Sequence, residues 1–349
     1  MRRIGIVFWA KGDGVATLHS QIVKRLGYEV ENFYSDQKLP EVLDLILLFG
    51  PWGSMLPLTI QLIAMPPAQR PRLVWWLSEQ LPNPALPEWL RYGGGWLRTH
   101  LERLAYMECP DGSWKQRGRM GKYLASKATR FRYYGDLLWL KREGILTCVV
   151  QGSGLSKRVL EKRGFRIYSP PSPSSFPEWG ADLQLERDIP VLWIGKVATR
   201  RRRRLLERVE SELGEHGVQM LRIDGERHPY VFGDERTVLL NRTKVVLNLL
   251  RAEWDNNAMR FHLAALNRAL VVTESMVAQT TFVPGVHLVE ASIEEIPDRI
   301  LHYLAHEDER QAITEQAYQL ITRHKREDVI AQLLKDFLGE YEGDSHSGK

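Results

Sequence analysis

The sequence contains little cysteine and no long apolar segment. Its 349 residues include two cysteines, Cys109 and Cys148, and no cysteine–histidine cluster has the spacing of a zinc site. Two cysteines are too few for a disulfide framework, which excludes a small disulfide-stabilised module. The first apolar stretch, residues 4–10, is short and is followed by glycines, so it indicates a β-strand rather than a signal peptide or a membrane span. We therefore expect a cytoplasmic protein.

The composition is that of an ordinary soluble protein with a small basic excess. Hydrophobic residues make up 44% and charged residues 26% of a chain that is long for one core, so two domains are expected. The formal net charge of +5 mildly favours anionic partners. Basic residues gather at residues 115–135 and 199–210. A charged stretch is usually a solvated helix face, and this interpretation stays open for the first stretch.

Strand-like apolar runs alternate with helical patterns along most of the chain. IGIVFWA, LDLILLFG, PRLVWWL and GILTCVV are strand-like in the first half, and IPVLWIG, VQMLRID, KVVLNLL and RALVVTES in the second. This alternation predicts doubly wound α/β domains, in which helices cover both faces of a parallel sheet.

A proline- and serine-rich segment separates the two alternating regions. We expect residues 169–188 to be a linker between an N-terminal Rossmann-like domain, residues 1–168, and a C-terminal Rossmann-like domain with terminal helices, residues 189–340. Residues 341–349 are expected to be a disordered tail. Ligands of such sheets bind beyond the carboxyl ends of the strands, so the natural site is a cleft where the two domains face each other.

Three stretches carry a family resemblance. VLWIGKVATRRRRRLLERV reads as a strand, a glycine, a small loop and an arginine-led helix, and KVVLNLLRAEWDNNAMRFHLAALNRALVVTES as an asparagine-containing strand, a helix and a strand ending in Thr-Glu. GPWGSMLP and LVWWLSEQLP read as N-terminal loops. Together they resemble glycosyltransferases of the GT-B fold, most closely the CgeB-like members of glycosyltransferase group 1. The resemblance implies metal-independent transfer of a sugar, with retention of configuration, from a nucleotide-sugar in the C-terminal domain to an acceptor on the N-terminal domain.

Two helix starts in the C-terminal domain suit a diphosphate. Sugar transfer leaves negative charge on the departing diphosphate, and helix N-termini with basic side chains stabilise such charge. One helix is expected to begin at Thr199 and the other near Asn256, and the sequence has no Asp-x-Asp metal motif. We expect no metal and no cofactor. The expected phosphate-binding residues are Gly195, Lys196, Arg200 and Arg260.

Further residues are expected around the two substrates, although none is assigned as catalytic. The donor sugar or nucleotide pocket is expected to contain Asp255, Asn256, Asn257, Thr273 and Glu274. The acceptor, a glycan, a lipid or a small molecule, is expected to meet loops that contain Gly12, Gly14, Gly53 and Glu79.

Structural roles compete with several of these assignments. Thr199 and Asp255 or Asn256 are ordinary N-caps, and Arg260 could form an ion pair with Asp255 or Glu253. The remaining structural alternatives are an i,i+4 pair of Arg203 with Glu207 and a helix cap at Glu274. His19 and His100 are possible bases, although a lone histidine is more often structural.

Leu263 stands where the related enzymes carry an acidic residue. In retaining members two acidic residues eight apart flank this helix, and the second grips the nucleotide ribose; here the positions fall at Asp255 and Leu263. The glycine that usually follows is replaced by Asn267 and Arg268. Arg260, Leu263 and Asn267 share one face of an α-helix, so we expect this wall of the cleft to keep its arginine and lose its carboxylate. Loss of the ribose contact costs about 1–3 kcal/mol. Three outcomes stay open: another residue takes the ribose, the donor differs, or the site has decayed.

Two other functions fit the same scaffold. In the first, the protein is a non-catalytic binding protein whose basic stretches, Lys115 to Arg132 and Arg200 to Arg204, hold nucleic acid or another polyanion, weakly at least. In the second, it is a nucleotide-sugar epimerase of similar fold, since the same phosphate-binding residues would bind the substrate of that reaction. The sequence does not identify the base, the sugar, the acceptor or the oligomeric state.

Overall fold

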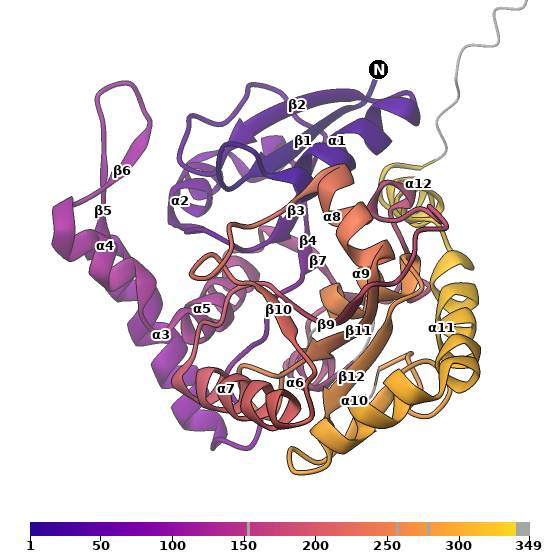
Figure 1. Ribbon diagram of the computed structural model, residues 1–349. Helices are drawn as coiled ribbons and strands as arrows, with labels where there is room; N and C mark the ends of the chain where they lie inside the picture. The colour runs from indigo at the N-terminus through magenta and orange to yellow at the C-terminus, as the bar shows by residue number, and fades with distance from the viewer. Residues whose placement is uncertain (152–153, 256–257, 278–279, 340–349) are drawn as a thin grey trace, which may run out of the picture. The chain divides into compact units, whose positions relative to one another are not determined.

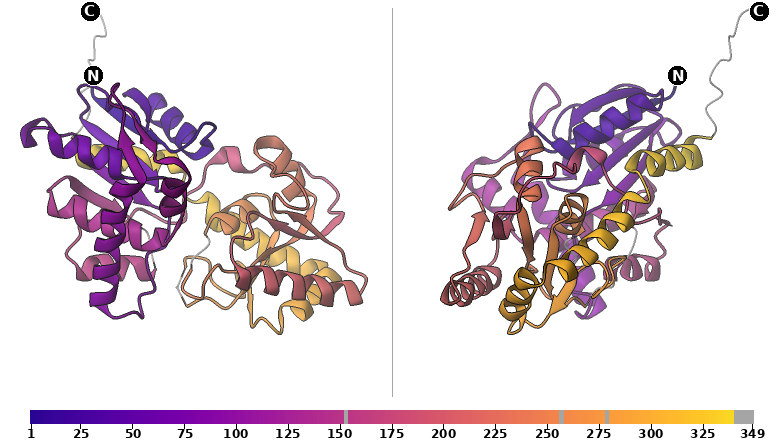
Figure 2. Two further views of the ribbon diagram at one scale, coloured as in Figure 1. Left: turned by 90° about the vertical axis from the view of Figure 1, so that its left-hand side faces the viewer. Right: turned by 45° about the vertical axis from the view of Figure 1, so that its right-hand side comes forward.

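The chain folds into two compact units. The computed structural model describes residues 1–151, 154–255, 258–277 and 280–339. Unit 1 comprises Met1–Pro170 and Glu327–Lys349, and unit 2 comprises Pro171–Arg326. Each unit is built on a parallel sheet with helices packed against its faces (Figures 1 and 2). In the described part of the chain no helix is long and apolar enough to cross a membrane.

Unit 1 contains a six-stranded parallel sheet and a separate antiparallel hairpin. Its elements in chain order are β1 (Arg3–Phe8), α1 (Gly14–Arg25), β2 (Glu29–Tyr34), β3 (Leu45–Gly50), α2 (Leu56–Ala64), β4 (Arg72–Leu77), α3 (Glu88–Ala105), β5 (Tyr106–Glu108), β6 (Trp114–Gln116), α4 (Gly118–Ser126), α5 (Thr129–Arg142), β7 (Leu146–Val150), α6 (Leu155–Lys162) and β8 (Ile167–Tyr168). The strand order is β2-β1-β3-β4-β7-β8, and β5 pairs with β6.

Unit 2 contains a five-stranded parallel sheet with the order β10-β9-β11-β12-β13. Its elements are a short 3-10 helix (Pro177–Trp179), β9 (Ile189–Ile194), α7 (Arg200–Glu215), β10 (Met220–Ile223), α8 (Gly233–Asn241), β11 (Thr243–Asn248), α9 (Ala258–Leu266), β12 (Leu270–Glu274), β13 (Val289–Ala291), α10 (Ile296–Ala305) and α11 (Glu307–Thr322). A last helix, α12 (Arg326–Leu338), returns the chain to unit 1.

The central strands are apolar because helices cover both faces of each sheet. All six residues of β3 are buried, and Trp75 of β4 and Trp193 of β9 are fully buried. Parallel strands in such a position are near-continuous runs of apolar residues. The predicted fold class, two doubly wound α/β domains, is confirmed.

The C-terminal helix α12 departs from the predicted domain boundaries, because it belongs to unit 1 and not to the second domain. Glu327 pairs with Arg25 of α1 at 2.7 Å. Asp336 accepts a hydrogen bond from Tyr168 at 3.0 Å, and the Phe337 ring lies 5.8 Å from that of Tyr168. These contacts depend on residues distant in sequence, so the helical pattern alone gave no indication of them.

The proline-rich segment is part of unit 2 from residue 171 onward, rather than a separate linker. Phe176 and Trp179 are buried aromatic side chains within it, and their rings lie 4.6 Å apart. Asn267 of unit 2 donates a hydrogen bond to the Trp179 carbonyl at 3.0 Å. The prolines break regular structure, as predicted, while the aromatic residues anchor the segment.

Candidate functional site

The carboxyl ends of β9, β11 and β12 form one edge of the unit 2 sheet. These strands end at Ile194, Asn248 and Glu274. Gly195 follows β9 with φ +112°, a conformation that favours glycine. A Cβ atom there would lie 3.1 Å from Nη2 of Arg260. The glycine therefore leaves room for an arginine side chain that crosses this edge.

Arg260 of α9 reaches across this edge to β9 and β11. Its Nε donates to the Ile194 carbonyl at 2.8 Å, and its Nη1 donates to Oδ1 of Asn248 at 3.0 Å. The guanidinium carbon lies 4.2 Å from the centroid of the Trp193 ring, and the residue is 6% exposed. Burial, together with the nearby Arg202, lowers the pKa of Arg260 well below its usual value. Among the described residues Arg260 forms no ion pair, so the predicted structural pair with Asp255 or Glu253 is absent there.

Arg202 lies in the first turn of α7 and turns toward the same indole. Its guanidinium carbon is 5.4 Å from the Trp193 ring centroid, and its Nη1 donates to the Lys196 carbonyl at 3.0 Å. Its Nε is buried without a hydrogen-bond partner. Burial and, to a lesser extent, the positive charge of Arg251 lower the pKa of Arg202 to about 10.

Helical spacing explains why Arg202 faces inward. It shares the buried face of α7 with Leu206, Val209 and Leu213. Thr199 is the N-cap, as predicted, and its side chain accepts from the Arg202 N–H at 3.2 Å. The helix N-terminus and the Arg202 guanidinium thus lie together at the sheet edge, and both favour a bound anion.

The two buried guanidinium groups lie against the same indole at this edge of the sheet. Neither Arg202 nor Arg260 forms an ion pair within the described ranges of the chain, although both are less than one-tenth exposed. A buried charge is costly unless an opposite charge accompanies it. Perturbed groups of this kind gather at functional sites, and an anionic ligand would balance the charge.

Arg201 makes a different set of contacts, with Glu274 at the end of β12. Its Nη1 donates to Oε1 of Glu274 at 3.1 Å and to the Leu250 carbonyl at 3.1 Å. Glu274 also accepts from the Leu250 N–H and is 3% exposed. Thr273 is fully buried and accepts from Asn248 Nδ2 at 2.9 Å. Glu274 and Thr273, expected in the donor pocket, therefore hold Arg201 and Asn248 in place, and Glu274 caps no helix in the described part of the chain.

The exposed members of the predicted phosphate set are Lys196 and Arg200. The structure turns both side chains to solvent, whereas Arg201 and Arg202 turn inward. Arg203 pairs with Glu226 at 2.7 Å in place of the predicted Glu207. Sequence reasoning missed Arg202 and the buried Trp193 beneath it; the apolar spacing of α7 was the signal that identifies Arg202 as an inward residue.

Asp255 is the one predicted donor-pocket acid next to α9. It is 2% exposed, and Oδ2 of its carboxylate lies 3.4 Å from Nε of Arg251. Asn256 and Asn257, expected in the same pocket, lie outside the described residues, as does the expected helix start at Asn256. The described part of α9 begins at Ala258.

Leu263 is buried, with 6% of its surface exposed, so this position of α9 offers no acceptor for a hydroxyl group. The expectation that Asn267 shares a cleft wall with Arg260 is not met. Asn267 donates to the carbonyls of Trp179 and Leu263 at 3.0 and 2.8 Å. Its side chain therefore contacts the first segment of unit 2, which contains Trp179. Seven residues of α-helix separate it from Arg260, about 10 Å along the axis.

Arg268 occupies a left-handed backbone conformation, φ +50°, where a glycine is expected in related sequences. Its side chain is fixed by α11: Nε pairs with Glu315 at 3.0 Å, and the guanidinium carbon lies 3.6 Å from the Tyr318 ring centroid. These contacts offset the backbone strain, which explains how the chain accommodates arginine there.

The predicted acceptor loops all follow strands of unit 1 at their carboxyl ends. Gly12 and Gly14 follow β1, and a Cβ atom at either would meet no atom within 4 Å, so the space above them is open. Gly53 follows β3, where a Cβ would lie 2.6 Å from Trp9. Glu79 follows β4 and accepts a hydrogen bond from Nε1 of Trp52 at 3.2 Å.

The two histidines proposed as possible bases, His19 and His100, differ in their surroundings. His19 is 1% exposed and stacks on Phe49 with the ring centroids 3.2 Å apart, which is a structural role. His100 is exposed on α3, and its Nδ1 lies 2.8 Å from the carbonyl oxygen of Trp96.

Comparison with known proteins places the fold. Residues 200–335 match the family model described as glycosyl transferase-like, while no curated protein matches the chain in sequence. Sucrose-phosphate synthase from Thermosynechococcus elongatus has a TM-score of 0.59 at 10% identity, with 97% of this chain and 98% of that chain covered. HepE from Anabaena, solved with UDP and glucose, has a TM-score of 0.58 at 12% identity, with 97% and 99% covered.

TarM is a longer relative in structure. Its TM-score is 0.51 at 12% identity over 84% of this chain, and the match covers 54% of TarM, so this chain spans about half the length of that protein. Identities this low establish the fold alone. The protein therefore has the GT-B fold of these glycosyltransferases, and its residues 200–335 match the glycosyl transferase-like family.

Proposed function

We propose that the protein is a glycosyltransferase that takes its sugar from a nucleoside-diphosphate sugar. The donor diphosphate binds at the carboxyl edge of the unit 2 sheet, against Arg202, Arg260 and the N-terminus of α7. The observation that carries the proposal is the pair of buried guanidinium groups without an ion-pair partner in the described residues. Two arginines and a helix N-terminus suit the charge and the geometry of a diphosphate.

The arginines also suit the chemistry of the transfer. When the bond between the sugar C1 and the diphosphate oxygen breaks, negative charge builds on the departing diphosphate, and the acceptor hydroxyl forms the new bond to C1. Arg260 is held by Ile194 and Asn248 before any ligand binds. Donors fixed in advance stabilise developing charge without reorganisation during the reaction. We propose that this replaces a metal ion and that configuration is retained, as the family resemblance implies.

The exposed side chains Lys196 and Arg200 have a secondary part in this proposal. Both lie at the mouth of the site, on the turn and the helix start that follow β9. Exposed cations attract an anionic donor over a distance but bind it weakly, because water and salt screen them. We propose that they assist donor capture, while Arg202 and Arg260 supply the affinity.

The ribose of the donor is proposed to bind without a carboxylate. Leu263 cannot accept a hydrogen bond, and Glu274 is committed to Arg201. The base and the phosphates then supply the donor affinity. Anabaena HepE is solved with UDP, which makes uridine diphosphate the first nucleotide to test.

The acceptor is proposed to bind at the carboxyl edge of the unit 1 sheet. Trp52 is 40% exposed there and donates to Glu79, which leaves one face of an aromatic ring and a carboxylate side by side. An aromatic face and a hydrogen-bonding carboxylate suit a hydroxyl-bearing acceptor such as a glycan.

A polyanion-binding role for the arginine run of α7 is disfavoured. Arg201 and Arg203 are engaged by Glu274 and Glu226, and Arg202 is buried. Only the exposed members, Arg200 and Arg204, face solvent without an ion pair among the described residues. A backbone of nucleic acid needs a row of free cations, which this helix lacks.

A thermal-shift screen tests the proposed function. Without added metal, UDP, GDP, ADP and TDP and their sugars are each added to the protein, and one nucleoside diphosphate is expected to raise the melting temperature. The R260M variant should lose this rise, whereas R204A, a change at an exposed arginine of the same run, should keep it. No rise with any nucleotide would contradict the proposal. Release of free nucleotide only when an acceptor is present separates a transferase from an epimerase.

A further inference from the structure

Helix α3 carries a stripe of large apolar side chains that unit 1 leaves exposed. Trp89 is 74% exposed, Trp96 50%, Leu97 53% and Leu104 60%. Their spacing, together with Gly93 and His100 between them, puts all of them on one face of an 18-residue helix. Single exposed apolar residues are ordinary, whereas a continuous stripe marks an interaction surface.

Helix α4 extends this surface beside α3. Met120 is 69% exposed and Tyr123 59%. Gly121 faces α3 so closely that a Cβ atom would lie 2.5 Å from the Ala105 carbonyl oxygen, which shows how tightly the two helices pack. In Figure 1, α3, α4 and the β5–β6 hairpin follow one another along the left-hand edge of the picture. We call these elements the α3–α4 surface.

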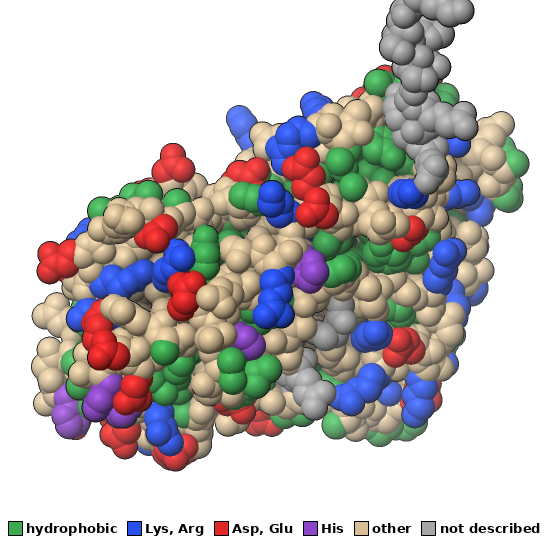
Figure 3. Space-filling model, turned by 90° about the vertical axis from the view of Figure 1, so that its right-hand side faces the viewer, with side chains coloured by type: hydrophobic (Ala, Val, Ile, Leu, Met, Phe, Trp, Pro, Cys, Tyr) green, Lys and Arg blue, Asp and Glu red, His purple; other side chains and the backbone are tan. Residues whose placement is uncertain are grey.

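Basic side chains accompany the apolar stripe in the last turn of α3, in the hairpin and along α4. Six of them are exposed, and none forms an ion pair within the part of the chain that the structure describes: Arg103, Lys115, Arg117, Arg119, Lys122 and Lys127. The exposed acids of the hairpin are Glu108 and Asp111, and Asp111 is engaged by Ser113. By contrast, basic and acidic side chains are interspersed on the face shown in Figure 3. The α3–α4 surface therefore has an excess of exposed positive charge that no ion pair among the described residues offsets.

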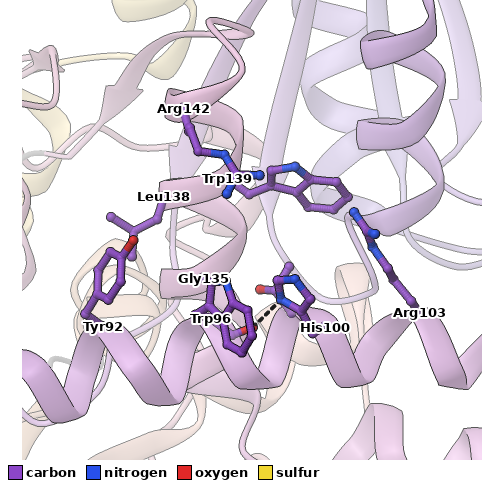
Figure 4. A pocket seen from close by; sticks show the side chains of 9 residues that line it. Tyr92, Trp96, His100, Arg103, Gly135, Leu138, Trp139 and Arg142 are labelled. Atoms are coloured by element: carbon purple, nitrogen blue, oxygen red, sulfur yellow. Dashed lines mark hydrogen bonds between the residues drawn. The ribbon is translucent and has the colours of Figure 1, made fainter.

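A pocket of about 160 Å³ opens between α3 and α5 at the edge of the stripe (Figure 4). Trp96 and His100 of the stripe form one wall, with their rings 4.0 Å apart. Trp139 of α5 lies across the pocket, and the guanidinium carbon of Arg103, also on α3, is 4.9 Å from its ring centroid. Aromatic rings and a cation thus meet at this edge, as they do where proteins contact the boundary between headgroups and acyl chains.

We propose that the α3–α4 surface docks on a bilayer that contains anionic phospholipid. Aromatic and aliphatic side chains on one face of a helix enter the headgroup–acyl boundary, while lysine and arginine around them bind lipid phosphates. A bilayer with anionic lipid provides a partner for both the apolar and the basic side chains of this surface. Nucleic acid would match the cations but leave Leu97, Leu104 and Met120 without a role, and a second copy of this chain would bring like charges together.

This inference does not rest on the proposed sugar transfer. The α3–α4 surface lies outside the residues assigned to the donor and the acceptor, so a failure of one proposal leaves the other standing.

Vesicle flotation of the full chain tests it. We expect the protein to float with vesicles of phosphatidylcholine and phosphatidylglycerol in a ratio of seven to three, and to remain in solution with phosphatidylcholine alone. The L97S/L104S variant should lower the partition coefficient about tenfold, since two large apolar side chains no longer enter the bilayer. R119E/K122E should lower it by a similar factor, and by more at low salt.

Matched controls distinguish binding through this surface from nonspecific binding to vesicles. F232S removes an aromatic side chain that is 71% exposed in unit 2, and R204E reverses an exposed arginine of α7; both should float like the unchanged protein. All changed positions are exposed, and circular dichroism checks that the variants fold. The proposal is overturned if the protein does not float with anionic vesicles, if the α3–α4 variants float unchanged, or if a short RNA binds while vesicles do not.

Discussion

The guanidinium group of Arg260 lies against the indole of Trp193, with its carbon 4.2 Å from the ring centroid. The same indole donates its Nε1–H to the Gly195 carbonyl at 2.8 Å. One buried residue of β9 therefore provides both the surface on which the arginine lies and a bond that fixes the turn before α7. Cation–π contact holds a charge in place without neutralising it, so the arginine remains available to an anion.

Replacing Arg202 should separate ligand binding from stability. Burial lowers the pKa of Arg202 to about 10, which means that the folded protein holds this charge at a cost. R202M keeps the length of the side chain and removes the charge. We predict a ligand-free melting temperature equal to or above that of the unchanged protein, and loss of the rise caused by the nucleotide. Calorimetry of both proteins with and without ligand checks this. A ligand-free melting temperature several degrees lower would contradict it.

The ribose should contribute little to donor affinity. Leu263 is buried and offers no acceptor, so removal of the 2′-hydroxyl leaves no protein group unpaired at this position. We predict that a nucleoside diphosphate and its 2′-deoxy form bind within about threefold of each other, measured by calorimetric titration. A loss of tenfold or more, about 1.4 kcal/mol, would show that another residue grips the ribose.

Asp136 in α5 should make the stability of the protein depend on pH. Burial raises the pKa of this carboxyl to about 7, against the opposing effect of Arg132, and Thr99 donates to it at 3.2 Å. The folded state therefore holds a proton that the unfolded state loses near pH 4, and stability falls as pH rises from about 4 to 7. D136N should remove this pH-dependent loss of stability. The free energy of unfolding of D136N, relative to that of the unchanged protein, should therefore increase from about pH 4 to 7 and stay constant at higher pH.

Urea denaturation at several pH values measures this difference in the free energy of unfolding. E108Q changes an exposed carboxyl of the same unit and serves as the control, with the pH dependence of the unchanged protein retained. A difference between D136N and the unchanged protein that is constant from pH 4 to 8 would count against the buried acid.

The turn after α9 should reveal the backbone strain at Arg268. R268A loses the contacts with Glu315 and Tyr318 but keeps a side chain at φ +50°, whereas R268G loses the same contacts and relieves the strain. We predict that the free energy of unfolding of R268G is about 1 kcal/mol higher than that of R268A. Equal stability of the two variants in urea denaturation would mean that the conformation carries no strain.

Local patterns predicted much of the fold and part of the site. Alternating apolar runs identified the strands of both sheets, and the cap at Thr199 with the arginines after it identified the start of α7. The inward turn of Arg202 follows from its spacing to Leu206 and Val209, so it was within reach of the sequence.

Other features depend on contacts that no local pattern encodes. The docking of α12 on unit 1 rests on pairs such as Arg25 with Glu327, far apart in the chain. The engagement of Glu274 by Arg201 joins the end of β12 to the start of α7. A strand-end glutamate looks the same in sequence whether it faces a ligand or an arginine, and only the packing of the two elements decides between them.

Calorimetric titration of a nucleoside diphosphate, with uridine diphosphate first, into the unchanged protein and the R260M and R200A variants tests the central claim most directly. We predict a measurable affinity for the unchanged protein, a loss of at least tenfold for R260M, which corresponds to one charge-assisted hydrogen bond of about 1.5–3 kcal/mol, and a much smaller loss for the exposed Arg200. Equal affinity of R260M and the unchanged protein would show that the buried arginines do not hold the diphosphate and would contradict the account.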